Sequence, residues 1–187
     1  LALGIIALIL VFILPPLFEG DLAVTSYEAA LSNDGTLSEQ YMYHVGTSGE
    51  YRMLYRIWEA PLTLSDSMEP FVRFVAMEPA GGTTGYIRAS DGTVTLYGTS
   101  ASESSQSRLE SLAEFNEVGL YNPSYFSAGE YPARYSYVLN PPLEYDASAT
   151  HLNLKLAGTS HIPYRSVKVK VPANGIDTVY AYPPSLQ

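Results

Sequence analysis

Residues 22–45 read LAVTSYEAALSNDGTLSEQYMYHV, and this stretch decides the fold class. Two runs suited to strands, Leu22–Leu31 and Leu37–Val45, flank Asn33-Asp34-Gly35. An Asp-Gly pair between alternating apolar runs is a strong signal of a tight β-hairpin, because both residues accept the positive φ angles of such turns. The stretch therefore predicts an antiparallel hairpin.

Further runs of this kind continue to the end of the chain, separated by Gly, Pro, Asn and Asp. Short strands with turn signals at close intervals are typical of a sandwich. We therefore expect a mainly β domain, an antiparallel β-sandwich with one short helix. The further strands are expected at Tyr51–Trp58, Phe71–Met77, Tyr86–Arg88, Val94–Tyr97, Ala133–Leu139, His151–Leu156, Arg165–Val171 and Thr178–Tyr182.

The one helix is expected after Ser100–Gln106, a serine-rich run that has the composition of an exposed loop and supplies capping residues. Gly119 is expected to stop it. The predicted apolar face of this helix consists of Leu109, Leu112, Ala113 and Phe115.

Two of the late strands alternate cleanly. In HLNLKL, residues 151–156, the three leucines lie opposite Asn153 and Lys155, and in VKVKV, residues 167–171, the valines lie opposite Lys168 and Lys170. Side chains alternate between the two faces of a strand, so each of these strands is expected to have one buried and one solvated face.

The first fourteen residues, Leu1–Leu14, read LALGIIALILVFIL and are followed by Pro15 and Pro16. As a helix they would extend about 21 Å, whereas a bilayer span takes about 20 apolar residues. No initiator Met precedes them, so we expect residues upstream of Leu1 in the encoded protein. The sequence thus predicts a hydrophobic, transmembrane anchor in residues 1–20 and an extracytoplasmic β domain in residues 21–187.

This leader permits three interpretations. It is a membrane anchor that contacts lipid through Leu1–Leu14, the processed hydrophobic helix of a filament subunit, or the core of a signal peptide. A helix buried in the domain core is disfavoured, because every face of the segment is apolar.

Composition excludes several classes of partner and site. The 187 residues carry a net charge of −9, which repels nucleic acid. Cys is absent, which removes disulfides, thiolate nucleophiles and Cys-ligated metals. The 16 Tyr residues indicate half-buried strand faces and a tyrosine-rich contact surface.

Motifs for catalysis, cofactors or metals are missing, and we predict no catalytic, cofactor-binding or metal-binding residue. His44, His151 and His161 lack metal-ligand spacing and nucleophile motifs, so ordinary hydrogen bonds are expected for them. Gly81-Gly82 followed by Gly85 lacks the Lys of a phosphate-binding loop and is expected to connect strands.

Acidic residues in turns offer a weaker alternative. Asp34, Asp91 and Asp146 have the chemistry of calcium ligands, but turn formation explains the first two without a metal.

Two segments resemble a known family. The first is NDGTLSEQYMYHV followed by GEYRMLYRI, and the second is YSYVLNPPLEYDASATHLNLKLAG followed by YRSVKVKVP. Together they resemble the extracytoplasmic domain of the YciQ-like proteins, prokaryotic predicted membrane proteins of unknown function. The resemblance covers most of residues 22–172. The family continues into further transmembrane helices and a low-complexity tail, which are not among these 187 residues. The positions that carry it are Asp34-Gly35, Glu39, Arg56, Asp146 and Pro172; the family's usual aromatic residue in the strand reading HLNLKL is absent here. As members of this family pattern, Glu39 and Arg56 are expected to pair across neighbouring strands, either to fix strand register or to contact a ligand.

The expected function is therefore that of a non-catalytic, membrane-anchored interaction domain, a structural or accessory subunit that docks on other membrane or envelope proteins or on copies of itself. The alternative is a pilin-like filament subunit with the N-terminal helix in the filament core, although Pro15-Pro16 ends that helix early. A hydrolase acting on envelope polymers would need carboxylates such as Glu28, Glu39 and Glu59 brought together by folding.

Overall fold

The computed structural model describes residues 20–66, 70–99, 101–141, 143–158, 161–172 and 174–181. The expected N-terminal helix lies outside these residues. Within the described ranges, no helix has the length and apolar character needed to cross a membrane.

The hairpin of residues 22–45 forms as predicted. Strand β1 (Leu22–Leu31) pairs antiparallel with β2 (Thr36–Val45). The turn is closed by hydrogen bonds from the amide of Ser32 to the carbonyl of Thr36 (2.8 Å) and from the amide of Gly35 to the carbonyl of Ser32 (3.1 Å). Gly35 adopts a φ of 82°, which explains the glycine at this position.

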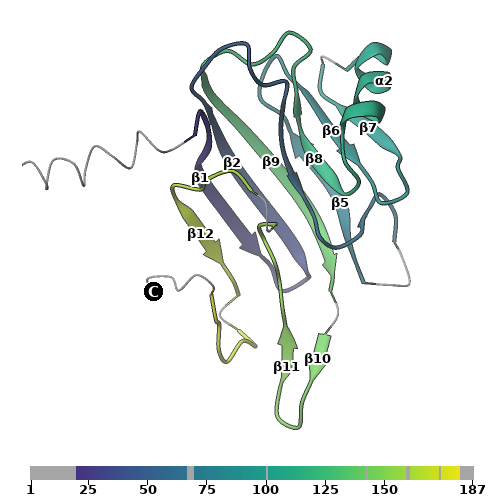
Figure 1. Cartoon of the computed structure of the whole chain (residues 1–187). Coiled ribbons are helices and arrows are strands. Elements are labelled where there is room, and N and C mark those ends of the chain that lie inside the picture. Colours follow the sequence, from purple (N-terminus) through teal and green to yellow (C-terminus); the bar gives the residue numbers. More distant parts are fainter. Residues whose placement is uncertain are drawn as a thin grey trace, which may run out of the picture.

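Two sheets face each other across one core (Figure 1). The six-stranded sheet has the order β12-β1-β2-β9-β5-β4, and the four-stranded sheet has the order β3-β8-β6-β7. The bounds are β3 Met53–Ile57, β4 Leu62–Thr63, β5 Phe71–Glu78, β6 Thr84–Arg88, β7 Val94–Tyr97, β8 Glu117–Tyr121, β9 Gly129–Asn140 and β12 Val167–Lys170. A separate hairpin consists of β10 Leu143–Tyr145 and β11 Thr150–Leu152.

The mainly β class and the short helix are confirmed, whereas a purely antiparallel arrangement is wrong. Strand β12 pairs parallel with β1, and β4 pairs parallel with β5, so the six-stranded sheet is mixed. The pairing of β12 with β1 joins residues about 140 positions apart, and such long-range pairing leaves no local signal in the sequence.

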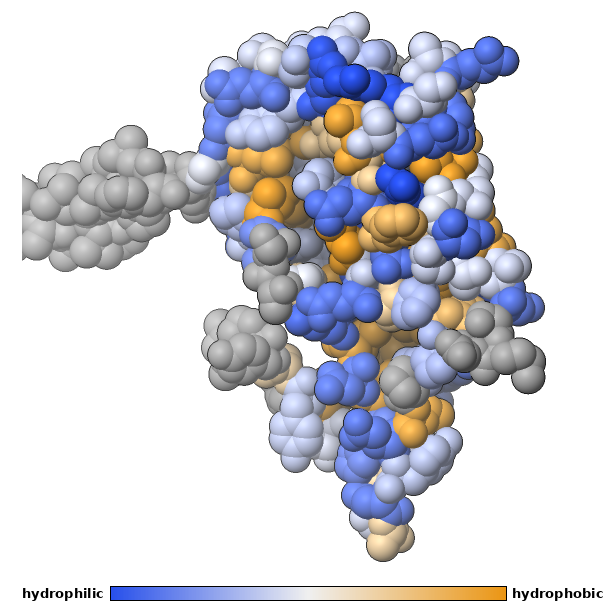
Figure 2. Space-filling model, turned by 45° about the vertical axis from the view of Figure 1, so that its right-hand side comes forward, coloured by the Kyte–Doolittle hydropathy of each residue, from blue (hydrophilic) through white to orange (hydrophobic). Residues whose placement is uncertain are grey.

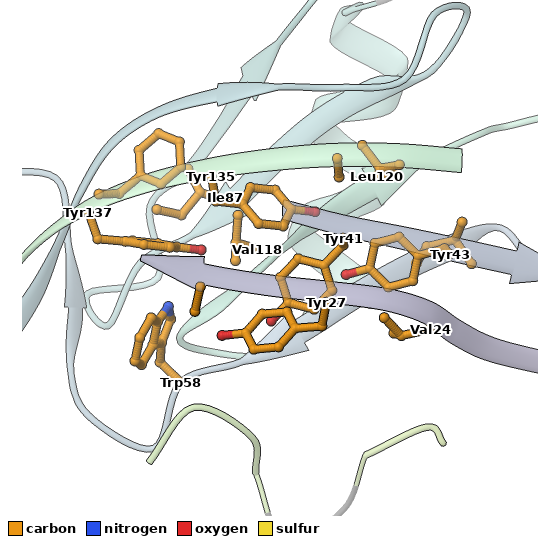
Figure 3. Close-up of a cluster of buried hydrophobic side chains, with 14 of the residues drawn as sticks. Val24, Tyr27, Tyr41, Tyr43, Trp58, Ile87, Val118, Leu120, Tyr135 and Tyr137 are labelled. Carbon is orange, nitrogen blue, oxygen red and sulfur yellow. The ribbon is translucent and has the colours of Figure 1, made fainter. Parts of the chain in front are cut away.

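Tyrosine rings fill much of the core between the sheets (Figure 3). The rings of Tyr41 and Tyr43, two residues apart on β2, stack with centroids 5.3 Å apart and an angle of 8° between their planes. The expectation of a tyrosine-rich contact surface is therefore wrong for the seven tyrosines that are buried. The buried tyrosines are Tyr27, Tyr41, Tyr43, Tyr86, Tyr121, Tyr135 and Tyr137.

Helix α2 (Glu103–Leu112) begins within the serine run that was expected to be a loop, where Ser102 caps it by accepting a hydrogen bond from the amide of Ser105 (3.2 Å). The predicted apolar face is half right, because Leu109 and Ala113 are buried while Leu112 and Phe115 are exposed. The helix ends before Gly119, which lies in β8.

The late strands differ most from prediction. Strand β11 ends at Leu152; beyond it Leu154 and Leu156 pack half-buried on the core without forming a strand. The valines of β12 and Val171 are exposed rather than buried, because within the described part of the chain no second layer covers either face of this edge strand. Residues 178–181 form no strand, and Tyr182 lies outside the described residues.

Candidate functional site

The sequence-predicted pair of Glu39 and Arg56 lies at the centre of the core. Arg56 Nη1 donates a hydrogen bond to Glu39 Oε1 over 2.5 Å. The expectation that the pair lies across neighbouring strands is wrong. Glu39 projects inward from β2 of one sheet, and Arg56 projects inward from β3 of the facing sheet. The pair therefore ties the two sheets together.

Aromatic side chains enclose this ion pair. Tyr27 Oη donates a second hydrogen bond to Glu39 Oε1 (2.6 Å), and the Arg56 guanidinium lies 3.5 Å from the ring centroid of Trp58. The Trp58 ring in turn meets Tyr137 edge-on, with centroids 5.1 Å apart. The Arg56 cation stacks on Trp58, and the Glu39 carboxylate accepts two hydrogen bonds. This buried network compensates part of the cost of desolvating both charges.

The ionisation of this cluster follows from burial. Burial disfavours the charged form of Arg56, but the adjacent Glu39 carboxylate and the surrounding tyrosines together outweigh this effect and raise the pKa of the guanidinium. Burial, and next the same carboxylate, raise the pKa of Tyr27, Tyr41 and Tyr137. The tyrosines therefore remain neutral at physiological pH, while Arg56 remains charged. Since Glu39 is fully buried, the pair has the geometry of an internal brace rather than of a ligand contact.

A second buried carboxylate, Glu117 on β8, was missed by the sequence reasoning. Its Oε1 accepts a short hydrogen bond from the hydroxyl of Tyr86, and its Oε2 accepts one from the amide of Glu114 (2.9 Å). Burial raises its pKa from an ordinary 4.5 to about 7. The sequence signal was the alternation in EVGLY, which places Glu117 and Tyr121 on one face and the two buried aliphatic residues on the other.

The three aspartates and the histidines have local partners. Asp34 Oδ1 accepts from the amide of Thr36 (3.0 Å) and Asp91 Oδ1 from that of Thr93 (2.9 Å), as the turn interpretation predicted. His44 Nδ1 lies 2.9 Å from Glu130 Oε1. Across the described ranges, no group of three potential metal-ligating side chains converges.

The carboxylates considered for hydrolysis pair with different cations. Glu39 meets Arg56 in the core, Glu59 meets Lys155 at 2.7 Å on the surface, and Glu28 lies 3.5 Å from Lys170. Folding does not assemble them into one acid–base site. The surface hollows, of about 150 Å³ and 130 Å³, lie on the outer face of the six-stranded sheet beside Arg134. Both are smaller than ordinary small-molecule sites.

The hairpin β10–β11 stands apart from both sheets (Figure 1) and carries exposed apolar side chains. Leu143 lies opposite Leu152 in its register, and Tyr145 is 73 % exposed at the turn. Asp146 holds the turn by accepting from the amides of Ser148 and Ala149, both at 2.7 Å. His151 Nε2, 2.7 Å from Asp146 Oδ2, is the main cause that lowers the pKa of this carboxyl group, followed by these amides.

The family of predicted membrane protein (DUF2207) N-terminal domains matches residues 23–187. The chain belongs to this family. The match spans the described domain, from β1 through both sheets and the projecting hairpin. No curated protein matches this DUF2207 domain. The family is one of predicted membrane proteins, so a membrane location is supported at that level.

Proposed function

We propose that this DUF2207 domain is the extracytoplasmic, non-catalytic interaction domain of a membrane-anchored protein, and that its two sheets form a sandwich that presents the β10–β11 hairpin to another membrane or envelope protein. The hairpin carries the proposal. Its apolar side chains are exposed, whereas most large apolar side chains of the sheets are enclosed. In Figure 2, hydrophobic residues stand among hydrophilic ones at the lower end of the molecule, where Figure 1 places the hairpin.

The chemistry of the hairpin suits a protein partner. Leu143 and Leu152 form an apolar pair on one face, and Tyr145 offers an amphipathic ring of the kind enriched at interface centres. The Asp146 turn keeps the tip ordered, which lowers the entropy that binding costs. The resemblance to the YciQ-like proteins supports the extracytoplasmic side and an anchor in Leu1–Leu14.

Site-specific photocrosslinking in cells tests the docking role. A photoreactive phenylalanine analogue at Tyr145 of the full chain is expected to trap one membrane protein, and the substitution Leu143→Asp is expected to abolish that product. Tyr125, an exposed tyrosine away from the hairpin, is the control position. Equal products at Tyr145 and Tyr125, or none at Tyr145, would overturn the proposal, and a ladder of self-crosslinks would support a filament subunit instead.

Sidedness has its own test, because the chain contains no cysteine. A single cysteine introduced by Ser104→Cys on exposed α2 should react with a membrane-impermeant maleimide in intact cells. Labelling only after lysis would place the domain on the cytoplasmic side.

A further inference from the structure

A second apolar surface lies at the edge of the six-stranded sheet, away from the hairpin. We call Val167–Val171, which comprises β12 and the residue after it, the β12 edge strip. Val167, Val169 and Val171 are 58 %, 48 % and 40 % exposed. Alternating aliphatic residues of this kind are ordinarily buried on one face, so their exposure indicates that something covers them.

Residues 147–176, which include the strip, carry positive charge, whereas the chain as a whole is negative. Residues 147–176 contain no Asp or Glu, although the whole chain carries a net charge of −9. All three lysines of the protein, Lys155, Lys168 and Lys170, lie within that stretch, together with Arg165. Two of the three lysines belong to the β12 edge strip. The strip therefore combines exposed aliphatic side chains with two ammonium groups. That of Lys170 lies 3.5 Å from Glu28 Oε2 on β1, an exposed ion pair of the weak kind that a lipid phosphate can replace.

A second copy of the chain is poorly suited to cover the β12 edge strip by strand pairing. Antiparallel pairing of β12 with β12 of another molecule, in the register that sets valine against valine, also sets Lys168 or Lys170 against a lysine of the other copy. Like charges directly opposite each other destabilise a strand pair, and lysines on edge strands commonly block such pairing.

The start of the domain lies beside the strip. The amide of Val24 donates to the carbonyl of Pro163 (2.8 Å), and the amide of Arg165 donates to the carbonyl of Val24 (2.9 Å). β12 then continues alongside β1 at the sheet edge (Figure 1). Five residues lie between Leu14 and Gly20, a reach of about 20 Å from one to the other. An anchor in Leu1–Leu14 therefore brings the bilayer within reach of this edge.

We infer that the β12 edge strip meets the membrane with its free backbone edge and binds anionic phospholipid. In this orientation the valines, on the inner face of the sheet with Tyr27 and Ala29, reach the headgroup–acyl boundary, and the ammonium groups of Lys168 and Lys170, on the outer face, reach lipid phosphates. This inference rests on the proposed function for the anchor, and it adds a lipid-binding surface that orients the domain. Lysine side chains suit this role, because their aliphatic stems lie on apolar surface while the charge reaches the phosphates.

Lipid contact is measurable with single-cysteine variants of the full chain. Val169→Cys carries an environment-sensitive fluorophore in the strip, and Ser104→Cys on α2 is the matched exposed control. The chain is reconstituted into vesicles of phosphatidylcholine, with or without phosphatidylglycerol, that contain a lipid-bound quencher. We expect quenching at Val169→Cys with phosphatidylglycerol and none at Ser104→Cys.

Neutralising both lysines in the K168Q/K170Q background should shift the equilibrium between lipid-contacting and free strip by roughly 30-fold, about fivefold for each lysine at an anionic surface. Equal quenching at both labels, quenching that ignores phosphatidylglycerol, or shielding that grows with protein concentration would overturn the inference; the last result would indicate a second copy. Flotation separates the two proposals. If the chain floats only with anionic vesicles, the proposed anchor is refuted and lipid binding by the strip is supported. If the chain floats with both lipid compositions while the label in the strip is not quenched, the anchor is supported and lipid binding by the strip is refuted.

Discussion

The brace between the sheets yields the sharpest stability prediction. Glu39→Gln keeps an acceptor for the hydroxyl of Tyr27 but leaves the Arg56 cation without its anion, and Arg56→Met leaves the Glu39 carboxylate without its cation. Breaking a buried pair by removing one partner costs about 3–5 kcal/mol, whereas removing both charges is often close to neutral. The free energy of unfolding of a folded domain is about 5–15 kcal/mol in total, so each single variant should lose a large share of its stability.

The double variant Glu39→Gln/Arg56→Met should therefore be more stable than either single variant. Urea unfolding followed by far-UV circular dichroism and by the fluorescence of Trp58, the single tryptophan, measures all four proteins of the cycle. Where a single variant fails to fold, recovery of folding in the double variant is the readout. If the two single losses add in the double variant, the charges act independently and the brace interpretation is wrong.

Three further variants test other parts of the domain. The pKa of Glu117 is raised to about 7, so the folded state holds its proton more tightly than the unfolded state does. The free energy of unfolding should therefore fall by about 3 kcal/mol as the pH rises from below 4.5 to above 7. Urea titrations at each pH should show that Glu117→Gln removes this pH dependence. Gly119→Ala should cost about 1–3 kcal/mol, because its Cβ would lie 2.5 Å from the carbonyl oxygen of Leu54, whereas Gly81→Ala, which faces open space, should unfold at nearly the wild-type urea midpoint. Ser102→Ala should cost about 1 kcal/mol through loss of the α2 cap, and a thermal midpoint equal to that of wild type would contradict this role.

Local chemistry explains which elements were predictable from the sequence. The β1–β2 hairpin was correct because the Asp34-Gly35 turn and the alternation around it are local signals. Strand β8 was missed because Gly119 was interpreted as a helix stop. Its real constraint is the close approach of β3, where the backbone of Leu54 leaves no room for a side chain.

The site was only partly predictable for a related reason. The pairing of Glu39 with Arg56 was expected because the resemblance singled out these two oppositely charged residues on predicted strands. Neither strand carries a signal that the two lie in different sheets that face each other. The same limit applies to the tyrosines, since the amphipathic ring suits both a wet surface and a core. The β12 valines show the converse error, because alternation reveals two faces and does not reveal whether a second layer covers one of them.

The parallel pairing of β1 with β12 has a consequence for biosynthesis. Tyr27 and Val167 are register partners although about 140 residues separate them in the chain. During synthesis from the N-terminus, β1 therefore lacks the hydrogen bonds on its β12 side until nearly the whole domain has left the ribosome. Contacts of such sequence separation slow the folding of a nascent chain and prolong its exposure to chaperones and proteases.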